Sequence, residues 1–151
     1  MLDAGISVRL FGSGWDRYVS RKLRGAFGAS IRPLCGDEYI KTLCASKICL
    51  CFLSKLNKST HTIRSFEIPA CGSLLLSERT DEMKELYEED KEAVYFSDKE
   101  ELVQKVQLLL EKPEKRDTIA LAGHRRCISD GHDVVTRMGK WSNIVCVRLN
   151  A

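Results

Sequence analysis

A polar stretch between two apolar segments concentrates side chains that could bind a phosphate. Asn57 and Lys58 lie in this stretch, and Thr62 begins a predicted helix that also carries Arg64 and Glu67. Hydroxyl groups and free backbone amides donate to phosphate oxygens, Lys58 or Arg64 adds positive charge, and Glu67 can accept from sugar hydroxyls. These five residues predict a site for a diphosphate. An alternative stays open, because hydroxyl residues before a helix often only cap it, and Arg64 and Glu67 could form an ordinary surface ion pair.

Two glycines mark a second candidate loop. Gly12, Gly14 and Trp15 follow the first predicted strand, and glycines at such a place allow a ligand to approach the backbone closely. A dinucleotide-binding fingerprint needs a third glycine, and Arg17 stands at that position. The loop is therefore a candidate binding loop, with a tight turn as the alternative.

Metal ligands and catalytic residues are not evident from the sequence. Cys49 and Cys51 are two positions apart, which places them on one face of a strand, whereas metal knuckles usually use C-x-x-C spacing. No D-x-D pair occurs either. His61 lies beside the candidate phosphate loop, but a histidine in such a position is often structural. We therefore assign no metal site and leave the catalytic residues unknown.

The candidate loops need a sheet whose strands end at one edge. Short apolar runs alternate with amphipathic stretches, which indicates a mostly parallel sheet with helices on both faces. We predict strands at Ile6–Phe11 and Ser30–Pro33 and a central strand in the apolar run at 48–53, buried on both sides. Ligands bind outside the carboxyl ends of such strands. The predicted fold class is α/β, as a single domain over 1–151.

The rest of the chain continues this alternation. Ser97 and Glu100 predict a capping box that opens an amphipathic helix, Pro113 begins another helix, and Gly123 predicts a bend or a close packing contact. Helical spacing competes with a strand-like pattern at 134–149, and we favour a helix. The other predicted elements are helices after Asp16 and at 37–45, 62–70 and 81–87, and strands at 74–76 and 93–96.

The composition is that of one soluble globular domain. Of 151 residues, 44% are hydrophobic and 30% are charged, and the formal net charge of +3 is too small to demand nucleic acid as a partner. No apolar run approaches the roughly 18 residues of a membrane span, and the N-terminal residues do not have the pattern of a secretory signal. Seven cysteines, an odd number, are interpreted as reduced core residues. We expect a cytoplasmic protein.

Several segments together resemble a known family. RSFEIPACG at 64–72, LLLSERTDEMKELY at 74–87, KEAVYFSDKEELVQKV at 91–106 and IALAGHRRC at 119–127 are similar to the C-terminal domain of CgeB-like (spore maturation protein) glycosyltransferases. The resemblance implies a Rossmann-like domain, one half of a GT-B fold, that binds a nucleoside-diphosphate sugar as donor substrate and needs no separate cofactor. It also implies that Glu67 contacts the ribose of the donor and that the preceding loop and helix start hold its diphosphate.

Two positions depart from the family pattern. Ser59 stands where the wider retaining group has the first glutamate of its E-x7-E signature, and Asp133 and Val134 follow His132 where the family has Thr-Tyr. An acceptor-binding domain would have to come from an N-terminal segment or a partner chain, and a homodimer is a further possibility. The alternative is a non-catalytic Rossmann-like binding or interaction module. An NAD-dependent oxidoreductase fails on the absent third glycine.

Overall fold

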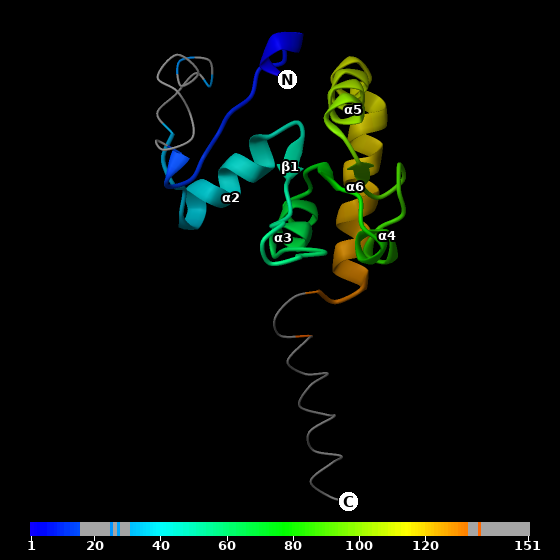
Figure 1. The fold of residues 1–151 in the computed structure, drawn as a ribbon. Helices are drawn as coiled ribbons and strands as arrows, with labels where there is room; N and C mark the ends of the chain where they lie inside the picture. The colour runs from blue at the N-terminus through cyan, green and yellow to red at the C-terminus, as the bar shows by residue number, and fades with distance from the viewer. Residues whose placement is uncertain (16–24, 26, 28–30, 133–135, 137–151) are drawn as a thin grey trace, which may run out of the picture.

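Three short parallel strands form the sheet of this domain. The computed structural model of the chain describes residues 1–15, 25, 27, 31–132 and 136. Its elements, in chain order, are η1 (Leu2–Ala4), α2 (Gly36–Ala45), β1 (Cys49–Cys51), α3 (Arg64–Ala70), β2 (Leu75–Glu78), α4 (Asp81–Leu86), β3 (Val94–Phe96), α5 (Lys99–Glu111) and α6 (Pro113–Ser129) (Figure 1). The strands have the order β1-β2-β3, so β2 is the middle strand. The predicted helices after Asp16 and at 134–149 lie outside the described residues, apart from Thr136.

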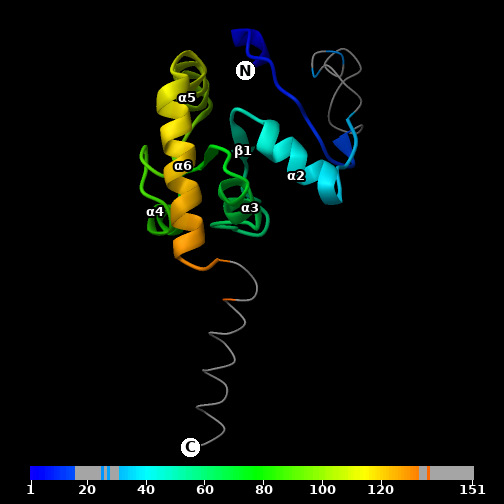
Figure 2. The ribbon, with the colours of Figure 1, turned by 180° about the vertical axis from the view of Figure 1, so that it is seen from behind.

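Both faces of the sheet are covered by helices. Successive residues of a strand point to opposite sides of the sheet, so each face has its own cluster of buried side chains. One face packs against α3, α4 and the second half of α6 through Cys49, Cys51, Leu75, Tyr95, Ile68, Met83, Tyr87 and Cys127. The other face packs against α5 and the first half of α6 through Leu74, Leu76, Val94, Phe96, Leu102, Val106, Leu109 and Ile119. The predicted α/β class is confirmed. Figures 1 and 2 show α2 on the opposite side of β1 from α5 and α6.

The apolar run at 48–53 forms a strand, but not the central one. Within the described part of the chain, β1 lies at the sheet edge and pairs only with β2. Cys49 and Cys51 are buried, whereas Leu50 is only half-buried and Phe52 is 56% exposed. The prediction of a central strand buried on both sides is therefore wrong. The reason is that an edge strand with one covered face can tolerate apolar residues on its other face as well.

The predicted first strand at Ile6–Phe11 is not a strand in the structure, and neither are residues 31–33 of the predicted second strand. Ile6 and Val8 do pack against the cluster around Leu74. One side of this segment is thus buried, which accounts for its alternating apolar pattern, although its backbone does not pair with β1. An alternating pattern reports which side chains are buried, and it does not show that the peptide groups are paired.

Two helix starts differ from their predictions. Helix α3 begins at Arg64, so Thr62, predicted to begin it, precedes the helix. The Asp98 side chain, not that of Ser97, caps α5 by accepting from the Glu101 amide at 2.8 Å, so the predicted cap is wrong by one residue. Glu101 in turn accepts from the Ser97 amide at 2.8 Å. Pro113 is the first residue of α6, as predicted. Both members of the predicted box are shifted together, because an aspartate at N-cap is as good an acceptor as a serine.

Gly123 is a point of close packing, as predicted. An added Cβ at this position would lie 2.2 Å from the backbone oxygen of Glu92, in the turn before β3. On the same helix, His124 Nδ1 lies 2.9 Å from the Pro69 oxygen, and the Cys127 thiol lies 3.6 Å from the Phe66 oxygen. Helix α6 is therefore held against both α3 and the turn before β3.

Candidate functional site

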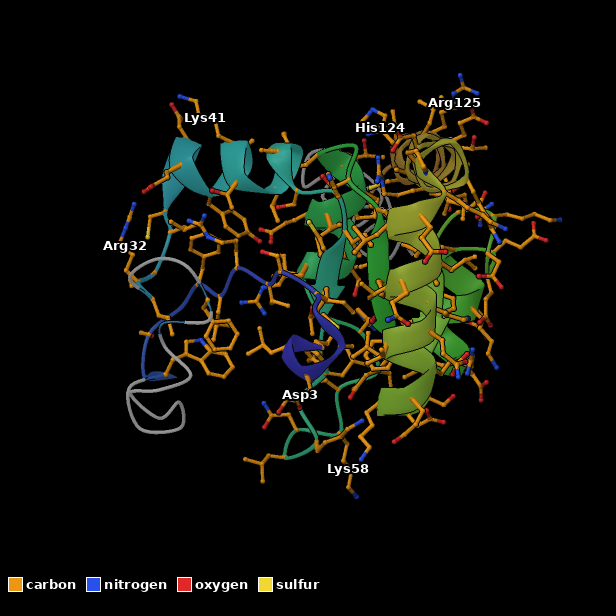
Figure 3. All side chains as sticks on the ribbon, turned by 90° about the horizontal axis from the view of Figure 1, so that it is seen from above. Asp3, Arg32, Lys41, Lys58, His124 and Arg125 are labelled. Atoms are coloured by element: carbon orange, nitrogen blue, oxygen red, sulfur yellow. The ribbon has the colours of Figure 1, made fainter. Side chains whose placement is uncertain are left out.

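The tip of the β1–α3 loop carries two exposed candidate residues, Asn57 and Lys58. Residues 55–58 form a turn in which the Lys58 amide donates to the Lys55 oxygen at 3.3 Å. The Asn57 amide donates to the Ser54 hydroxyl at 3.3 Å. Lys58 has a left-handed backbone with φ 48°, and its side chain projects away from the domain in Figure 3. The ammonium of Lys58 is therefore accessible to an anionic ligand.

The base of the loop is fastened to the sheet by hydroxyl groups. Thr62 Oγ1 lies 3.5 Å from Cys51 Sγ on β1, and the Thr62 amide donates to the Ser65 hydroxyl at 3.2 Å. The Thr80 hydroxyl, which follows β2, donates to the Thr60 oxygen at 2.8 Å. The side chain of Thr62 therefore joins the loop to β1 instead of capping α3. These contacts fix the segment that precedes Arg64 and Glu67 at the carboxyl ends of β1 and β2.

Glu67 is oriented by a residue that the sequence analysis did not select. The Tyr39 hydroxyl donates to Glu67 Oε2 at 2.7 Å, across 28 positions in sequence. Burial, and then the contact with the Glu67 carboxylate, raise the pKa of Tyr39 to about 12, so its hydroxyl remains a donor at neutral pH. In the helix predicted at 37–45, helical spacing places Tyr39 on one face with Ile40, Leu43 and Cys44. A half-buried tyrosine on such a face needs a partner for its hydroxyl, and that need was the available signal.

Arg64 and Glu67 do not form the surface ion pair that stood as an alternative. Among the ion pairs of the described residues, none joins these two side chains. The Arg64 guanidinium lies beside the Tyr39 hydroxyl and is exposed. Glu67 thus keeps its Oε1 oxygen clear of Tyr39, and Arg64 keeps an exposed face.

The glycine loop forms a tight turn around its own tryptophan. Gly12 and Gly14 have φ values of 136° and 78°, which favour glycine. The Trp15 Nε1 group donates to the Phe11 oxygen at 3.3 Å, and an added Cβ at Gly12 would lie 2.7 Å from that nitrogen. The Gly12 amide donates to the Arg32 oxygen at 3.0 Å. These contacts support the tight-turn alternative, and the binding role of this loop stays a prediction.

Helix α2 connects the two candidate loops. Arg32, whose backbone oxygen accepts from the Gly12 amide, forms a two-point ion pair with Glu38 in the first turn of α2. The next residue, Tyr39, holds Glu67. Figure 3 shows Arg32 beside the N-terminal end of α2, well apart from Lys58 in this view. The structure therefore places Arg64 and Glu67 on one helix and Asn57, Lys58 and Thr62 on the adjoining loop. Gly12 is linked through Arg32 to the first turn of α2, which also carries Tyr39.

A second charged cluster follows the ends of β2 and β3. Arg79 Nη2 lies 2.6 Å from both Glu89 Oε1 and Glu101 Oε1, and Arg79 also bonds the Ser97 hydroxyl. Lys105 Nζ lies 3.1 Å from Glu89 and 3.2 Å from Glu101. The hydrogen bond from Arg79 lowers the pKa of Glu101 to about 2, and the pKa of Glu89 is lowered for the same first reason. Because every partner is within the domain, this cluster stabilises the fold.

The Glu101→Gln substitution is expected to make the free energy of unfolding depend less on pH in the acidic range. Folding lowers the pKa of Glu101 to about 2, from about 4.3 in the unfolded chain. The ionised carboxylate therefore stabilises the folded state fully above the unfolded pKa, and this stabilisation is lost as the pH falls to about 2. Glu101→Gln should therefore be less stable than the wild type at pH 7 and equal to it near pH 2. Urea unfolding at pH 7, 4, 3 and 2 measures the difference, with the exposed Glu100→Gln as control. A difference that stays constant across this range contradicts the prediction.

Two further findings apply to the part of the chain that the structure describes. No group of three or more histidine, cysteine or acidic residues there could hold a metal ion. Within the same residues, no helix combines the length and the apolar character needed to cross a membrane. All six described cysteines are free. Cys49, Cys51 and Cys127 are buried, whereas Cys35 and Cys44 are exposed, so the interpretation of the cysteines as core residues is wrong for these two.

The parallel sheet, its two helical layers and the polar loops at the strand ends define a Rossmann-like α/β domain. Residues 2–143 match the Glycosyl transferase-like family, and the chain belongs to it. The structure of Anabaena Alr3699/HepE in complex with UDP is similar, with a TM-score of 0.71 at 17% identity over 97% of this chain and 44% of that one. The C-terminal domain of a glycosyl transferase group 1 family protein (LpcC) from Francisella tularensis has a TM-score of 0.57 at 14% identity, over 81% of this chain and 64% of that one.

At 17% and 14% identity, the likeness to the two structures concerns the fold. The chain spans less than half of the HepE chain. No curated protein matches the chain.

Proposed function

We propose that this chain is the nucleotide-sugar-binding half of a GT-B glycosyltransferase of the CgeB-like type. Membership of the Glycosyl transferase-like family over residues 2–143 is the observation that carries the proposal. The UDP in complex with the similar Anabaena protein supports a nucleoside diphosphate as the recognised part of the donor. The family match does not favour the non-catalytic module that the sequence left open.

In the proposed site, each side chain has a separate task. Glu67 accepts from the ribose hydroxyls of the donor, and Lys58 and Arg64 lie on the loop and helix start where the diphosphate would be held. Departure of the nucleoside diphosphate adds negative charge to the leaving phosphate, and nearby cations lower the energy of that charge. Asn57, Thr62 and the turn at Gly12, Gly14 and Trp15 remain proposed contacts. The residue that activates the acceptor hydroxyl stays unassigned.

The acceptor is proposed to bind outside this domain. The HepE chain, which this chain covers to 44%, is long enough to hold a second domain of similar size. We propose that such a domain, in a longer chain or in a partner, completes the catalytic site, with a homodimer as the alternative. The cytoplasmic location expected from the sequence stays a prediction.

Calorimetric titration with UDP, GDP and ADP, and with the three corresponding nucleosides, tests the donor-binding role. We expect one nucleoside diphosphate to bind more tightly than the others and more tightly than its nucleoside. Thermal unfolding gives an independent readout, since a ligand at a hundred times its dissociation constant stabilises a protein by roughly 2.7 kcal/mol. Failure of all three diphosphates to bind or to raise the melting temperature at millimolar concentration would overturn the proposal.

A further inference from the structure

We propose that Tyr39 is a positioning residue that sets the orientation of the Glu67 carboxylate for recognition of the ribose diol. This inference rests on the proposed function and adds a residue from a different helix to the site. Its basis is the 2.7 Å hydrogen bond from the Tyr39 hydroxyl to Glu67 Oε2. Tyr39 does not need to touch the nucleotide in order to act.

The single hydrogen bond fixes the carboxylate and leaves it able to bind. An ionised carboxylate has two oxygens and about four acceptor positions. Tyr39 takes one position on Oε2, so Oε1 and the remaining lone pair of Oε2 stay available to a ligand. Two adjacent acceptors match the two neighbouring hydroxyls of a ribose. A carboxylate that is fixed before the ligand arrives loses less conformational freedom on binding.

Helix α2 is tied to the sheet at its C-terminal end and to α3 through Tyr39. At the C-terminal end of α2, the Leu43 oxygen accepts from the Ser73 hydroxyl at 2.5 Å and lies 3.9 Å from the Cys49 thiol. At the N-terminal end, Glu38 is paired with Arg32. The contacts at Leu43 join α2 to β1 and to the segment before β2, whereas the Arg32–Glu38 pair is exposed and lies within one segment of the chain. The hydrogen bond from Tyr39 to Glu67 is therefore the contact that docks the first turn of α2 on α3.

The same contact separates the roles of two neighbouring charges. Arg64 and Glu67 are three positions apart on α3, a spacing at which opposite charges often pair. In the structure, Glu67 bonds to Tyr39, while Arg64 lies beside the tyrosine hydroxyl and remains exposed. Tyr39 thereby keeps the carboxylate directed to the sugar and leaves the guanidinium for phosphate.

The test compares UDP with 2′,3′-dideoxyuridine diphosphate, which lacks the ribose diol. For Tyr39→Phe we expect the affinity for UDP to fall about five- to tenfold, less than for loss of the carboxylate itself, because Glu67 remains and only its fixed orientation is lost. The affinity for the dideoxy nucleotide should stay within about twofold, because it makes no contact with Glu67. Thr42→Ala, which removes another hydroxyl from α2, is the matched control and should bind both nucleotides as the wild type does.

Calorimetry on the wild type, Tyr39→Phe, Glu67→Gln and the double variant separates the possible outcomes. In the expected result, the double variant binds UDP about as weakly as Glu67→Gln alone. Equal loss of affinity for UDP and the dideoxy nucleotide in Tyr39→Phe assigns Tyr39 a structural role only and overturns the inference. Unchanged UDP affinity in Tyr39→Phe, with weakened binding in Glu67→Gln, overturns the inference and leaves the proposed function intact. Unchanged UDP binding in Glu67→Gln overturns the inference and the ribose role of Glu67. Failure of the wild type to bind any of UDP, GDP and ADP overturns the proposed function as well.

Discussion

Replacing Gly123 with alanine is expected to destabilise the domain by about 2 kcal/mol or more and to lower its melting temperature by roughly 4–8 °C or more. In an open helix position the same change would stabilise by up to about 1 kcal/mol, since alanine favours the helix more than glycine does. At Gly123, however, the new Cβ would meet the Glu92 backbone oxygen at 2.2 Å. A backbone oxygen cannot rotate away as a side chain can, so α6 or the turn before β3 has to move.

Urea unfolding followed by circular dichroism measures this effect. Thr118→Ala, on an exposed position of the same helix, is the matched control and should change stability by less than about 0.5 kcal/mol. A Gly123→Ala protein that is as stable as the wild type, or more stable, shows that α6 does not approach Glu92 as closely as the structure has it. The displaced helix would also carry His124 and Cys127 away from α3.

The elements with strong local signals could be predicted from the sequence. Helix α5 has a regular apolar spacing and an acidic cap, and α6 begins at a proline that suits a first helical position. Strands β2 and β3 are short apolar runs whose every residue but Glu78 is buried. In each of these cases, local propensity and tertiary packing favour the same structure.

The predictions that failed depended on partners distant in sequence. The apolar run around Cys51 indicated burial on both sides, but burial depends on how many strands pair with β1, and no pattern within the run records that number. The segment Ile6–Phe11 has the alternation of a strand, and it buries Ile6 without pairing its backbone. Hydrophobic pattern therefore predicted which residues enter the core better than it predicted the order of the strands.

In the candidate site, too, local signals were recognised in the sequence and contacts between distant residues were not. The polar loop and Glu67 were found because their residue types suit a phosphorylated ligand. Tyr39 was missed because a tyrosine in an apolar helical stripe looks like core, and its hydroxyl partner lies 28 residues away. Arg79 was missed because its partners, Glu89 and Glu101, come from two separate segments. Long-range polar contacts of this kind leave no periodic trace in a sequence.

Glu67→Ala is expected to weaken nucleoside-diphosphate binding by roughly ten- to a hundredfold. The change removes the acceptor proposed for the ribose hydroxyls, and a lost hydrogen bond to a charged group costs about 1.5–3 kcal/mol. It also leaves the Tyr39 hydroxyl without its carboxylate partner, so Glu67→Gln, whose amide oxygen can still accept from Tyr39, is needed to separate binding from folding. Calorimetric titration with UDP measures both variants, with circular dichroism to confirm that they fold.

Arg64→Ala provides the matched comparison, because Arg64 and Glu67 occupy neighbouring turns of the same helix but are proposed to act on different parts of the ligand. Loss of the Arg64 charge should weaken UDP more than uridine, since the guanidinium acts on phosphate. Loss of Glu67 should weaken UDP and uridine by similar factors, since both carry the ribose. Increasing salt should reduce the Arg64 effect more than the Glu67 effect, because salt screens an exposed charge. If a folded Glu67→Ala protein binds UDP with unchanged affinity, Glu67 has no ribose role, and its contact with Tyr39 serves only to dock α2 on α3.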